Sequence, residues 1–175
     1  MGKAFTFQFE GLDKALSKLK DLPDDIKEEI NETIEDSAKE VVKKAKIRAP
    51  KFDGQLQQAI GYGPMQGGVG FEVFAAKNYA AFMEFGTGPK VKVPSELSAY
   101  AAQFKNSKKG TFEDMVKNIQ RWLKKKGGTG ERNEAVFVSL QILRNGLNPQ
   151  PFFFNSYFEE RIKLLQRIKN VLKLK

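Results

Sequence analysis

The sequence predicts an α+β fold, in which a small antiparallel sheet is packed by a long N-terminal helix and a C-terminal helix, with an inserted helical hairpin. Three observations support this prediction. Residues 4–9 and 70–75 alternate apolar and polar side chains, which is the pattern of half-buried strands. Residues 24–47 space their apolar side chains by three and four, as an amphipathic helix does. Two shorter helical patterns follow between residues 111 and 146, and a last one closes the chain.

The first strand is predicted from phenylalanines at every second position of residues 4–9. A short helix is expected over residues 12–22, and Pro23 separates it from the long helix of residues 24–47. The long helix begins with acidic residues and ends with basic ones, and both ends complement the helix dipole. The basic end, residues 43–48, has a second interpretation as a DNA-binding surface. The buried stripe of the long helix is predicted to comprise Ile26, Ile30, Ile34, Ala38, Val41 and Ala45.

A β-hairpin is expected after the long helix. Pro50 ends the helix, and the Asp-Gly pair at residues 53–54 turns the chain. Residues 56–63 and 70–75 are the two predicted strands of the hairpin. Residues 79–85 follow as a short helix or an irregular segment.

The next predicted helix begins at Thr111. Asp114 lies three residues after Thr111, which is the spacing of a capping box. Trp122, the only tryptophan, is interpreted as a core residue or a subunit contact rather than a ligand platform. The apolar face of this helix is predicted to comprise Met115, Ile119, Trp122 and Leu123.

A second helix of the hairpin is expected to be capped by Asn133 and to end at Asn145–Gly146. Its buried side is predicted to comprise Val136, Leu140 and Leu143. This pair of helices is interpreted as an insertion between two parts of a common core.

Three consecutive phenylalanines, Phe152, Phe153 and Phe154, precede the last predicted helix. Alternate residues of a strand point to opposite faces, so an extended segment cannot turn all three rings to one core. Either at least one ring meets a partner surface, or the segment is buried on both faces. The last helix is expected to begin near residues 155–156. Its inward face is predicted to comprise Phe158, Ile162, Leu165, Ile168 and Leu172.

The composition excludes several classes of active site. The chain has no histidine and no cysteine, so Ser-His triads, Cys-His dyads and ordinary zinc sites are excluded. An enzyme would need a carboxylate site such as Asp53 with Glu84, for which the sequence gives no geometry. No stretch of eighteen apolar residues is present, so no membrane span is expected. We therefore expect a protein that is not an enzyme, with no cofactor, no metal site and no membrane contact.

The net charge of +9 is unevenly distributed. Residues 1–89 carry 12 Lys and Arg against 14 Asp and Glu, whereas residues 90–175 carry 18 against 7. A basic second half indicates an acidic partner, which could be nucleic acid, an anionic protein surface or a neighbouring subunit. The other interpretation is a solvated basic face without a partner.

The most informative stretch is residues 79–89, where aromatic and small residues alternate before a Gly-Thr-Gly-Pro loop. Glu84 lies inside the apolar part of this stretch, and a buried carboxylate requires a partner or hydrogen-bond donors. We expect Glu84 to accept hydrogen bonds from the loop around Thr87. The alternative is that Glu84 is half exposed at the end of an element.

These residues resemble a known signature. Residues 79–88 are similar to the Tyr-Ala-x-Phe-x-Glu-Phe-Gly-Thr-Gly motif of the HK97 gp10-like proteins, which are tail-completion or head-tail joining components of long-tailed bacteriophages. Residues 49–56 resemble the family's Ala-Pro-x-Asp-Thr-Gly-x-Leu run, and residues 150–152 resemble its Gln-Pro-Phe. Two departures are evident: the threonine between Asp53 and Gly54 is missing, and a long stretch separates the second motif from the third.

The resemblance assigns roles to individual residues. The fold-defining residues that it implies are Pro50, Asp53, Gly54, Tyr79, Glu84, Phe85, Gly86, Thr87 and Gly88. The candidate subunit or partner contacts are Trp122, Gln150, Pro151, Phe152, Phe153 and Phe154. The length of 175 residues suits a single domain, predicted as a gp10-like core of residues 1–89 and 149–175 with a helical insertion over about 90–148.

The resemblance also implies a function. The chain would be a structural virion protein that forms a homo-oligomeric ring, a hexamer, at the head-tail interface. As a tail terminator or neck protein, it would complete the tail and join it to the head connector. Its partners would be the tail tube protein and the head-tail connector or stopper protein, and genomic DNA would pass the lumen only transiently. Its place would be the neck of the virion, after assembly in the host cytoplasm.

A basic nucleic-acid-binding protein is the alternative function class. The sequence pI of about 9.6 and the aromatic residues interleaved with lysine favour it. The absence of a known reader motif and the spread of the basic residues over several elements disfavour it. Salt-dependent binding to generic DNA would distinguish this class from a ring-forming structural protein.

Overall fold

The computed structural model describes residues 6–7, 22–51, 54–65, 70–77, 79–98 and 111–173. The chain divides into two compact units, and each is described by itself. Unit 1 comprises residues 1–49, 55–77 and 152–175, and unit 2 comprises residues 50–54 and 78–151. The predicted α+β class is confirmed, with a three-stranded sheet and helices that pack against it.

The long helix of unit 1, α2 (Asp24–Arg48), forms as predicted and has 25 residues, so it is about 37 Å long. It ends because Pro50 disfavours the helical conformation of the preceding residue, and Ala49 accordingly has an extended ψ of 139°. All six residues of the predicted stripe are buried, together with Ser37 and Val42. Their burial fixes α2 against strands β2 and β3 and against helix α8.

The sheet of unit 1 contains β1 (Thr6–Phe7), β2 (Ile60–Pro64) and β3 (Phe71–Ala75) in the order β1-β3-β2. Both neighbouring pairs are antiparallel, so the predicted hairpin of β2 and β3 is confirmed. Pro64 is tolerated as the last residue of β2 because this strand lies at the edge of the sheet. The expected helix of residues 12–22 and most of the expected first strand lie outside the described residues.

The start of the second strand was predicted wrongly. Residues 55–58 form one turn of helix, α3 (Gln55–Gln58), and the strand begins only at Ile60. The turn of helix buries Leu56, and the side chain of Gln57 donates a hydrogen bond to the carbonyl oxygen of Lys46 at the end of α2. These tertiary contacts outweigh a weak alternating pattern that is only a few residues long.

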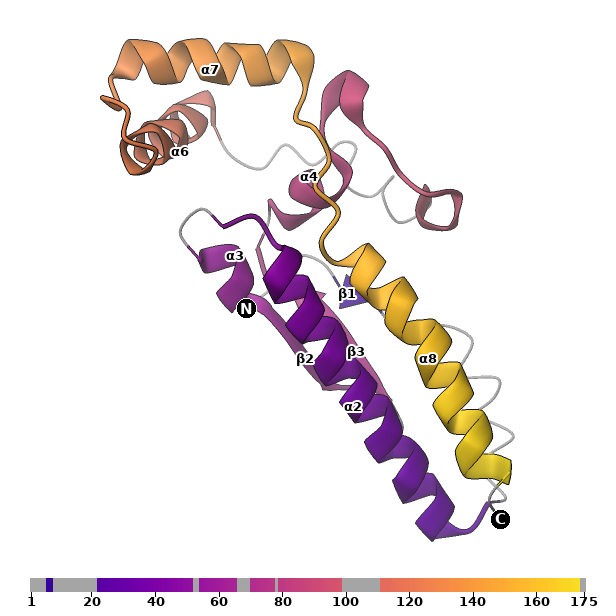
Figure 1. Cartoon of the computed structure of the whole chain (residues 1–175). Helices are drawn as coiled ribbons and strands as arrows, with labels where there is room; N and C mark the ends of the chain where they lie inside the picture. Colours follow the sequence, from indigo (N-terminus) through magenta and orange to yellow (C-terminus); the bar gives the residue numbers. More distant parts are fainter. Residues whose placement is uncertain are drawn as a thin grey trace. The chain divides into compact units, whose positions relative to one another are not determined.

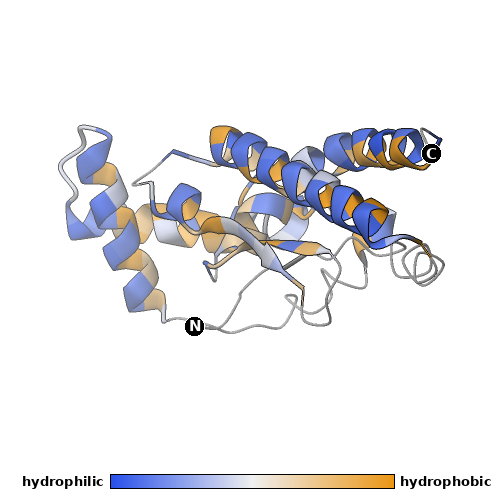
Figure 2. Ribbon diagram, turned by 90° about the horizontal axis from the view of Figure 1, so that it is seen from below, coloured by the Kyte–Doolittle hydropathy of each residue, from blue (hydrophilic) through white to orange (hydrophobic). Residues whose placement is uncertain are grey.

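The C-terminal helix α8 (Phe154–Lys173) lies along α2 and runs antiparallel to it (Figure 1). Its predicted inward face was wrong, because Ile162, Leu165 and Leu172 are exposed. The apolar residues of α8 occupy a wider arc than the surface that α2 covers. Figure 2 shows both hydrophobic and hydrophilic residues along this helix, which ends at the C label. The residues that α8 buries are Phe154, Ser156, Tyr157, Glu160 and Leu164.

Unit 2 begins with a short helix, α4 (Ala80–Phe85), and two single 3₁₀ turns, η1 (Gly88–Lys90) and η2 (Ser95–Leu97). A helical hairpin of α6 (Phe112–Lys125) and α7 (Arg132–Asn145) follows, as predicted. Residues 78–89, expected in the core, group with this hairpin in the structure. The assignment of the whole chain to a single domain stays a prediction.

The first helix of the hairpin confirms the predicted cap. The side chain of Thr111 accepts a hydrogen bond from the backbone N–H of Asp114, and the side chain of Asp114 accepts one from the backbone N–H of Thr111. The pair therefore satisfies two donors at the start of α6. The core of the hairpin comprises Val116, Leu123 and Ala135, with Ile119 and Val136 packed against it.

Two predictions for α7 were wrong. Glu131, not Asn133, is the N-cap residue, and Leu140 and Leu143 are 52% and 62% exposed. The buried side of α7 instead presents the small residues Ala135 and Ser139, both 0% exposed. Small side chains one turn apart allow two helices to approach closely, so the bulkier leucines remain on the outside.

Candidate functional site

The Gly-Thr-Gly loop follows α4 directly. Helix α4 ends at Gly86, which has a φ of +77°, a conformation that other residues rarely adopt. A Cβ atom at Gly86 would also lie 2.6 Å from the carbonyl oxygen of Leu147. Position 86 therefore requires glycine for two reasons, its backbone conformation and the approach of a distant segment.

The distant segment is held by Thr87. The backbone N–H of Thr87 donates to the carbonyl oxygen of Leu147 at 3.1 Å, and the backbone N–H of Leu147 donates to Thr87 Oγ1 at 2.8 Å. The backbone N–H of Gln150 donates to the carbonyl oxygen of Met83 at 2.7 Å. We call this set of contacts, between residues 83–88 and 146–150, the clasp.

Gly146 completes the clasp. It is the C-cap of α7 with a φ of +74°, and a Cβ atom there would overlap the carbonyl oxygen of Thr87. The sequence predicted Gly146 only as the stop of a helix. Its role in the clasp carries no separate sequence signal, because the Asn-Gly pair is explained equally well by the helix end alone.

The other predicted motif residues are placed as follows. Glu84 and Phe85 are buried in α4, and Tyr79, the N-cap of α4, is 40% exposed. The half-exposed alternative for Glu84 is wrong, whereas its acceptance of hydrogen bonds from the loop stays a prediction. Pro50 follows α2, and Gly54 has a φ of +76° just before α3. Asp53 lies outside the described residues.

The three phenylalanines are core residues of unit 1. Phe152 and Phe153 are 0% exposed and Phe154 is 6% exposed, so none of these rings presents a contact surface for a partner. The argument from strand geometry fails because Phe154 is already the first residue of a helix. The other two residues of the motif, Gln150 and Pro151, are exposed and stay candidate contacts.

Trp122 is 36% exposed on α6, so the interpretation as a core residue is wrong. It precedes the buried core residue Leu123 in the sequence of α6. The interpretation as a subunit contact stays a prediction.

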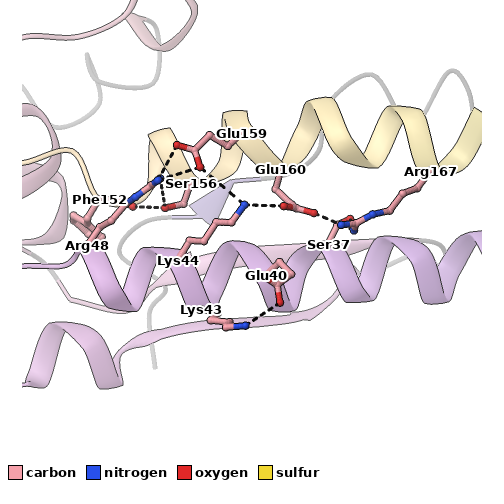
Figure 3. A network of polar contacts seen from close by, with 10 residues as sticks. All are labelled: Ser37, Glu40, Lys43, Lys44, Arg48, Phe152, Ser156, Glu159, Glu160 and Arg167. Atoms are coloured by element: carbon pink, nitrogen blue, oxygen red, sulfur yellow. Dashed lines mark hydrogen bonds and ion pairs between the residues drawn. The ribbon is translucent and has the colours of Figure 1, made fainter.

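A network of charged side chains joins α2 to α8, and Figure 3 shows it. At its centre, Glu160 is 1% exposed, with Lys44 Nζ 2.9 Å from its Oε2 and Arg167 Nη1 3.0 Å from its Oε1. Arg167 Nη1 donates its hydrogen bond to Ser37 Oγ at 3.0 Å, so its contact with Glu160 is an ion pair without hydrogen-bond geometry. Removing the Glu160 carboxylate from water costs free energy, and the two neighbouring cations compensate this cost.

The network continues toward the end of α2. Both oxygens of Glu159 accept from Arg48 Nη2, at 2.8 and 3.0 Å, and Arg48 Nη1 donates to Ser156 Oγ at 3.2 Å. Hydrogen bonding from Arg48 lowers the pKa of Glu159 below its ordinary value of 4.5. We call the network the α2–α8 seam; it comprises Ser37, Lys44, Arg48, Ser156, Glu159, Glu160 and Arg167.

The sequence did not reveal the seam. Glu160 lies among charged residues of a basic helix and has the appearance of a solvated side chain. One of its two partners, Lys44, is more than a hundred positions away in α2, so only the antiparallel packing of the two helices brings this pair together. The seam occupies Lys44 and Arg48, and Lys43 pairs with Glu40, so most of the predicted basic end of α2 is already engaged.

Clusters of metal-ligand side chains and membrane-spanning helices are both absent from the described residues. Among them, no group of three or more acidic side chains is placed to hold a metal ion. Nor does any of their helices have the length and apolar character to cross a membrane.

Comparison with known proteins identifies one family. Residues 13–86 match the model of the HK97-gp10-like family, described as "Bacteriophage HK97-gp10, putative tail-component". The curated proteins and the solved structures gave no match. The matched segment contains α2, the sheet hairpin and α4 up to Gly86, and so includes the start of the loop that the clasp holds. The match covers fewer than half of the 175 residues, and over this segment the chain is similar to a family of putative bacteriophage tail components, which supports a structural role in a phage.

Proposed function

We propose that the protein forms a homo-oligomeric ring at the head-tail interface of a tailed bacteriophage, where it completes the tail and joins it to the head connector. The observation that carries this proposal is the family match over residues 13–86. The hexameric state and the neck position follow from the resemblance of the motifs at residues 79–88 and 150–152. The tail tube protein and the connector or stopper protein are the proposed partners, and DNA passes the lumen only transiently.

The chemistry of the described residues supports a structural role. The chain has no histidine or cysteine, and the buried carboxylate of the seam is held by two cations. A general acid or base must be free to exchange a proton with a substrate, which a carboxylate fixed in ion pairs is not. We therefore propose that the protein catalyses no reaction and acts through its interfaces.

A ring requires head-to-tail contacts between two different surfaces of the subunit. The exposed start of α2 carries acidic residues, of which Glu28, Glu29 and Glu32 form no ion pair with any described residue. The exposed side of α8 carries cations that are likewise unpaired within the described chain, namely Arg161, Lys163, Lys169 and Lys173. Surfaces of opposite charge steer subunits toward each other and suppress wrong orientations.

Nucleic-acid binding is the competing function, and the unpaired cations of α8 are the observation in its favour. The measurement that separates the two is the mass of the purified protein by light scattering, alone and with purified tail tubes, beside its binding to random DNA. Oligomers of defined mass, or protein that sediments with tubes, would support the proposal. A monomer that ignores tubes but binds DNA, with an affinity that falls steeply as salt rises, would overturn it.

A further inference from the structure

Helix α8 presents an apolar face that no described residue covers. Ile162 is 71% exposed, Leu165 48% and Leu172 43%, whereas Tyr157 and Leu164 on the inner side are buried. At 100° per residue, the three exposed residues fall within an arc of about 80°, which Arg161 and Lys173 flank and Lys169 interrupts. We call Ile162, Leu165 and Leu172 the α8 outer face.

Helix α7 of unit 2 has a second face of the same kind. Its inner side buries Ala135 and Ser139 against α6, and its outer side leaves Phe137, Leu140 and Leu143 between 52% and 63% exposed. These three residues lie at spacings of three, so they form one stripe along the helix. We call them the α7 outer face.

The charges around the two faces are opposite. The α8 outer face is bordered by Arg161, Lys169 and Lys173, all exposed and without an ion pair inside the described chain. Glu131 is the N-cap residue of α7, and Glu134 lies in its first turn. Both are exposed and form no ion pair with a described residue. Two α8 outer faces brought together would oppose cations to cations, and so self-pairing of α8 is disfavoured.

The acidic start of α2 offers a poorer partner for the α8 outer face. Its exposed side is almost entirely polar, and the large apolar residue that α2 exposes, Ile47, lies at the other end of the helix. An apolar stripe gains free energy only when apolar surface covers it. The α7 outer face supplies both apolar surface and acidic residues.

We propose that the α8 outer face of one copy docks on the α7 outer face of a second copy. The helices run antiparallel, which brings Lys169 and Lys173 toward Glu131 and Glu134 and opposes the helix dipoles favourably. Because the two faces differ, the contact is head-to-tail and can repeat around a ring. The inference rests on the proposed function, for which it names the subunit contact.

Cysteine cross-linking tests the contact directly, because the chain has no cysteine of its own. Leu165→Cys in one preparation and Leu140→Cys in another are mixed with a short thiol-to-thiol cross-linker. We expect a cross-linked dimer in the mixture and several-fold less in either preparation alone. The matched control replaces the first variant by Ile47→Cys, which is exposed on α2, and should give no more dimer than the single preparations.

Three results would overturn the inference. As much dimer in Leu165→Cys alone as in the mixture would show that α8 pairs with itself. A third preparation carries Leu165→Cys and Leu140→Cys in one chain, and an intrachain cross-link in it would show that the same chain covers its own α8 outer face. Absence of any cross-link above the Ile47→Cys control, with and without tail tubes, would show that the faces do not meet.

A charge exchange separates failure of the contact from failure of the proposed function. One variant carries Lys169→Glu and Lys173→Glu, and the other carries Glu131→Lys and Glu134→Lys. We expect each variant alone to lose assembly, and an equal mixture to regain it because every contact then joins opposite charges. If each variant alone still forms rings or caps tubes, the contact is wrong although the proposed function stands. If the unmodified protein neither assembles nor binds tubes and the cysteine variants give no cross-link, both fail.

Discussion

Two regions of this protein join segments that are far apart in the sequence, and they do so by different means. In the α2–α8 seam of unit 1, side chains of residues 37–48 bind side chains of residues 156–167 through buried and half-buried charges. In the clasp of unit 2, residues 83–88 bind residues 146–150 through backbone hydrogen bonds and a threonine hydroxyl, and the close approach of the two segments requires glycine at positions 86 and 146.

The difference explains which residues make a recognisable motif. A backbone contact with glycines constrains the residue type at each position, so the clasp leaves a readable Gly-Thr-Gly signature. A side-chain network constrains only the match between partners, and other pairs could take its place. The seam consequently holds unit 1 together without marking the sequence.

The largest effect is expected in the seam from Lys44→Met. Without Lys44, the buried carboxylate of Glu160 keeps only the ion pair with Arg167, and breaking a buried pair in this way costs about 3 kcal/mol of unfolding free energy. The matched control is Lys43→Met, because Lys43 pairs with Glu40 on the exposed side of α2 and should contribute about 0–1 kcal/mol. The free energies of unfolding of both variants are measured by urea denaturation, with circular dichroism as the signal. Equal losses in the two variants would contradict a buried seam.

In the clasp, Gly146→Ala is expected to destabilise unit 2 by about 2 kcal/mol, from backbone strain together with overlap on the carbonyl oxygen of Thr87. Trp122, in α6, lets its fluorescence follow the unfolding of unit 2. Gly127→Ala is the control, since Gly127 also has a positive φ but nothing lies within 4 Å of an added Cβ atom. If Gly146→Ala loses no more stability than Gly127→Ala, the close approach of Gly146 to the carbonyl oxygen of Thr87 does not matter for stability.

A smaller loss of unfolding free energy is expected from Thr87→Val. This change keeps the shape of the side chain and removes the acceptor of the Leu147 N–H. An unsatisfied donor at this half-buried position should cost about 1 kcal/mol. Thr33→Val serves as the control, because the Thr33 hydroxyl donates to the carbonyl oxygen of Glu29 within α2 and joins no distant segment. If Thr87→Val and the unmodified protein unfold at the same denaturant concentration, the hydroxyl of Thr87 does not stabilise the clasp.

The smallest expected effect is on the pH dependence of stability. It involves one exposed ion pair in each unit. Arg48 lowers the pKa of Glu159 in unit 1, and Arg132 lowers the pKa of Glu113 in unit 2, both from an ordinary value of 4.5. A carboxyl with a lowered folded-state pKa stabilises the fold above its unfolded pKa, and the stabilisation is lost as the pH falls through the folded value. Between about pH 5 and pH 3, Glu159→Gln should therefore flatten the acid dependence of unit 1 and Glu113→Gln that of unit 2.

Unfolding midpoints of the two variants at several pH values in this range check the prediction. The control is Asp24→Asn, because the carboxylate of Asp24 pairs with Lys27 but its side chain is 98% exposed. If Glu159→Gln and Asp24→Asn change the acid dependence equally, the link between Arg48 and the pKa of Glu159 is contradicted.

The sequence predicted the elements better than their orientations. Strong signals, such as the proline-bounded repeat of α2 and the capping box of Thr111, gave the correct helices because local interactions decide them. The faces of α7 and α8 were predicted wrongly because their apolar residues exceed what their neighbours cover. Glu160 was missed because its partner Lys44 lies in another helix. The motif around Gly86 was found, but Gly146 and Leu147 were not, since nothing in the sequence links positions sixty residues apart.

The proposed function requires the protein to lie at one end of a phage tail, and electron microscopy can locate it there. Purified tail tubes are mixed with the purified protein carrying a gold label, and negative-stain micrographs record where the label lies. We expect label at a single end of each tube, as a cap or ring. Label along the whole tube, or none on tubes while the protein coats random DNA, would contradict it.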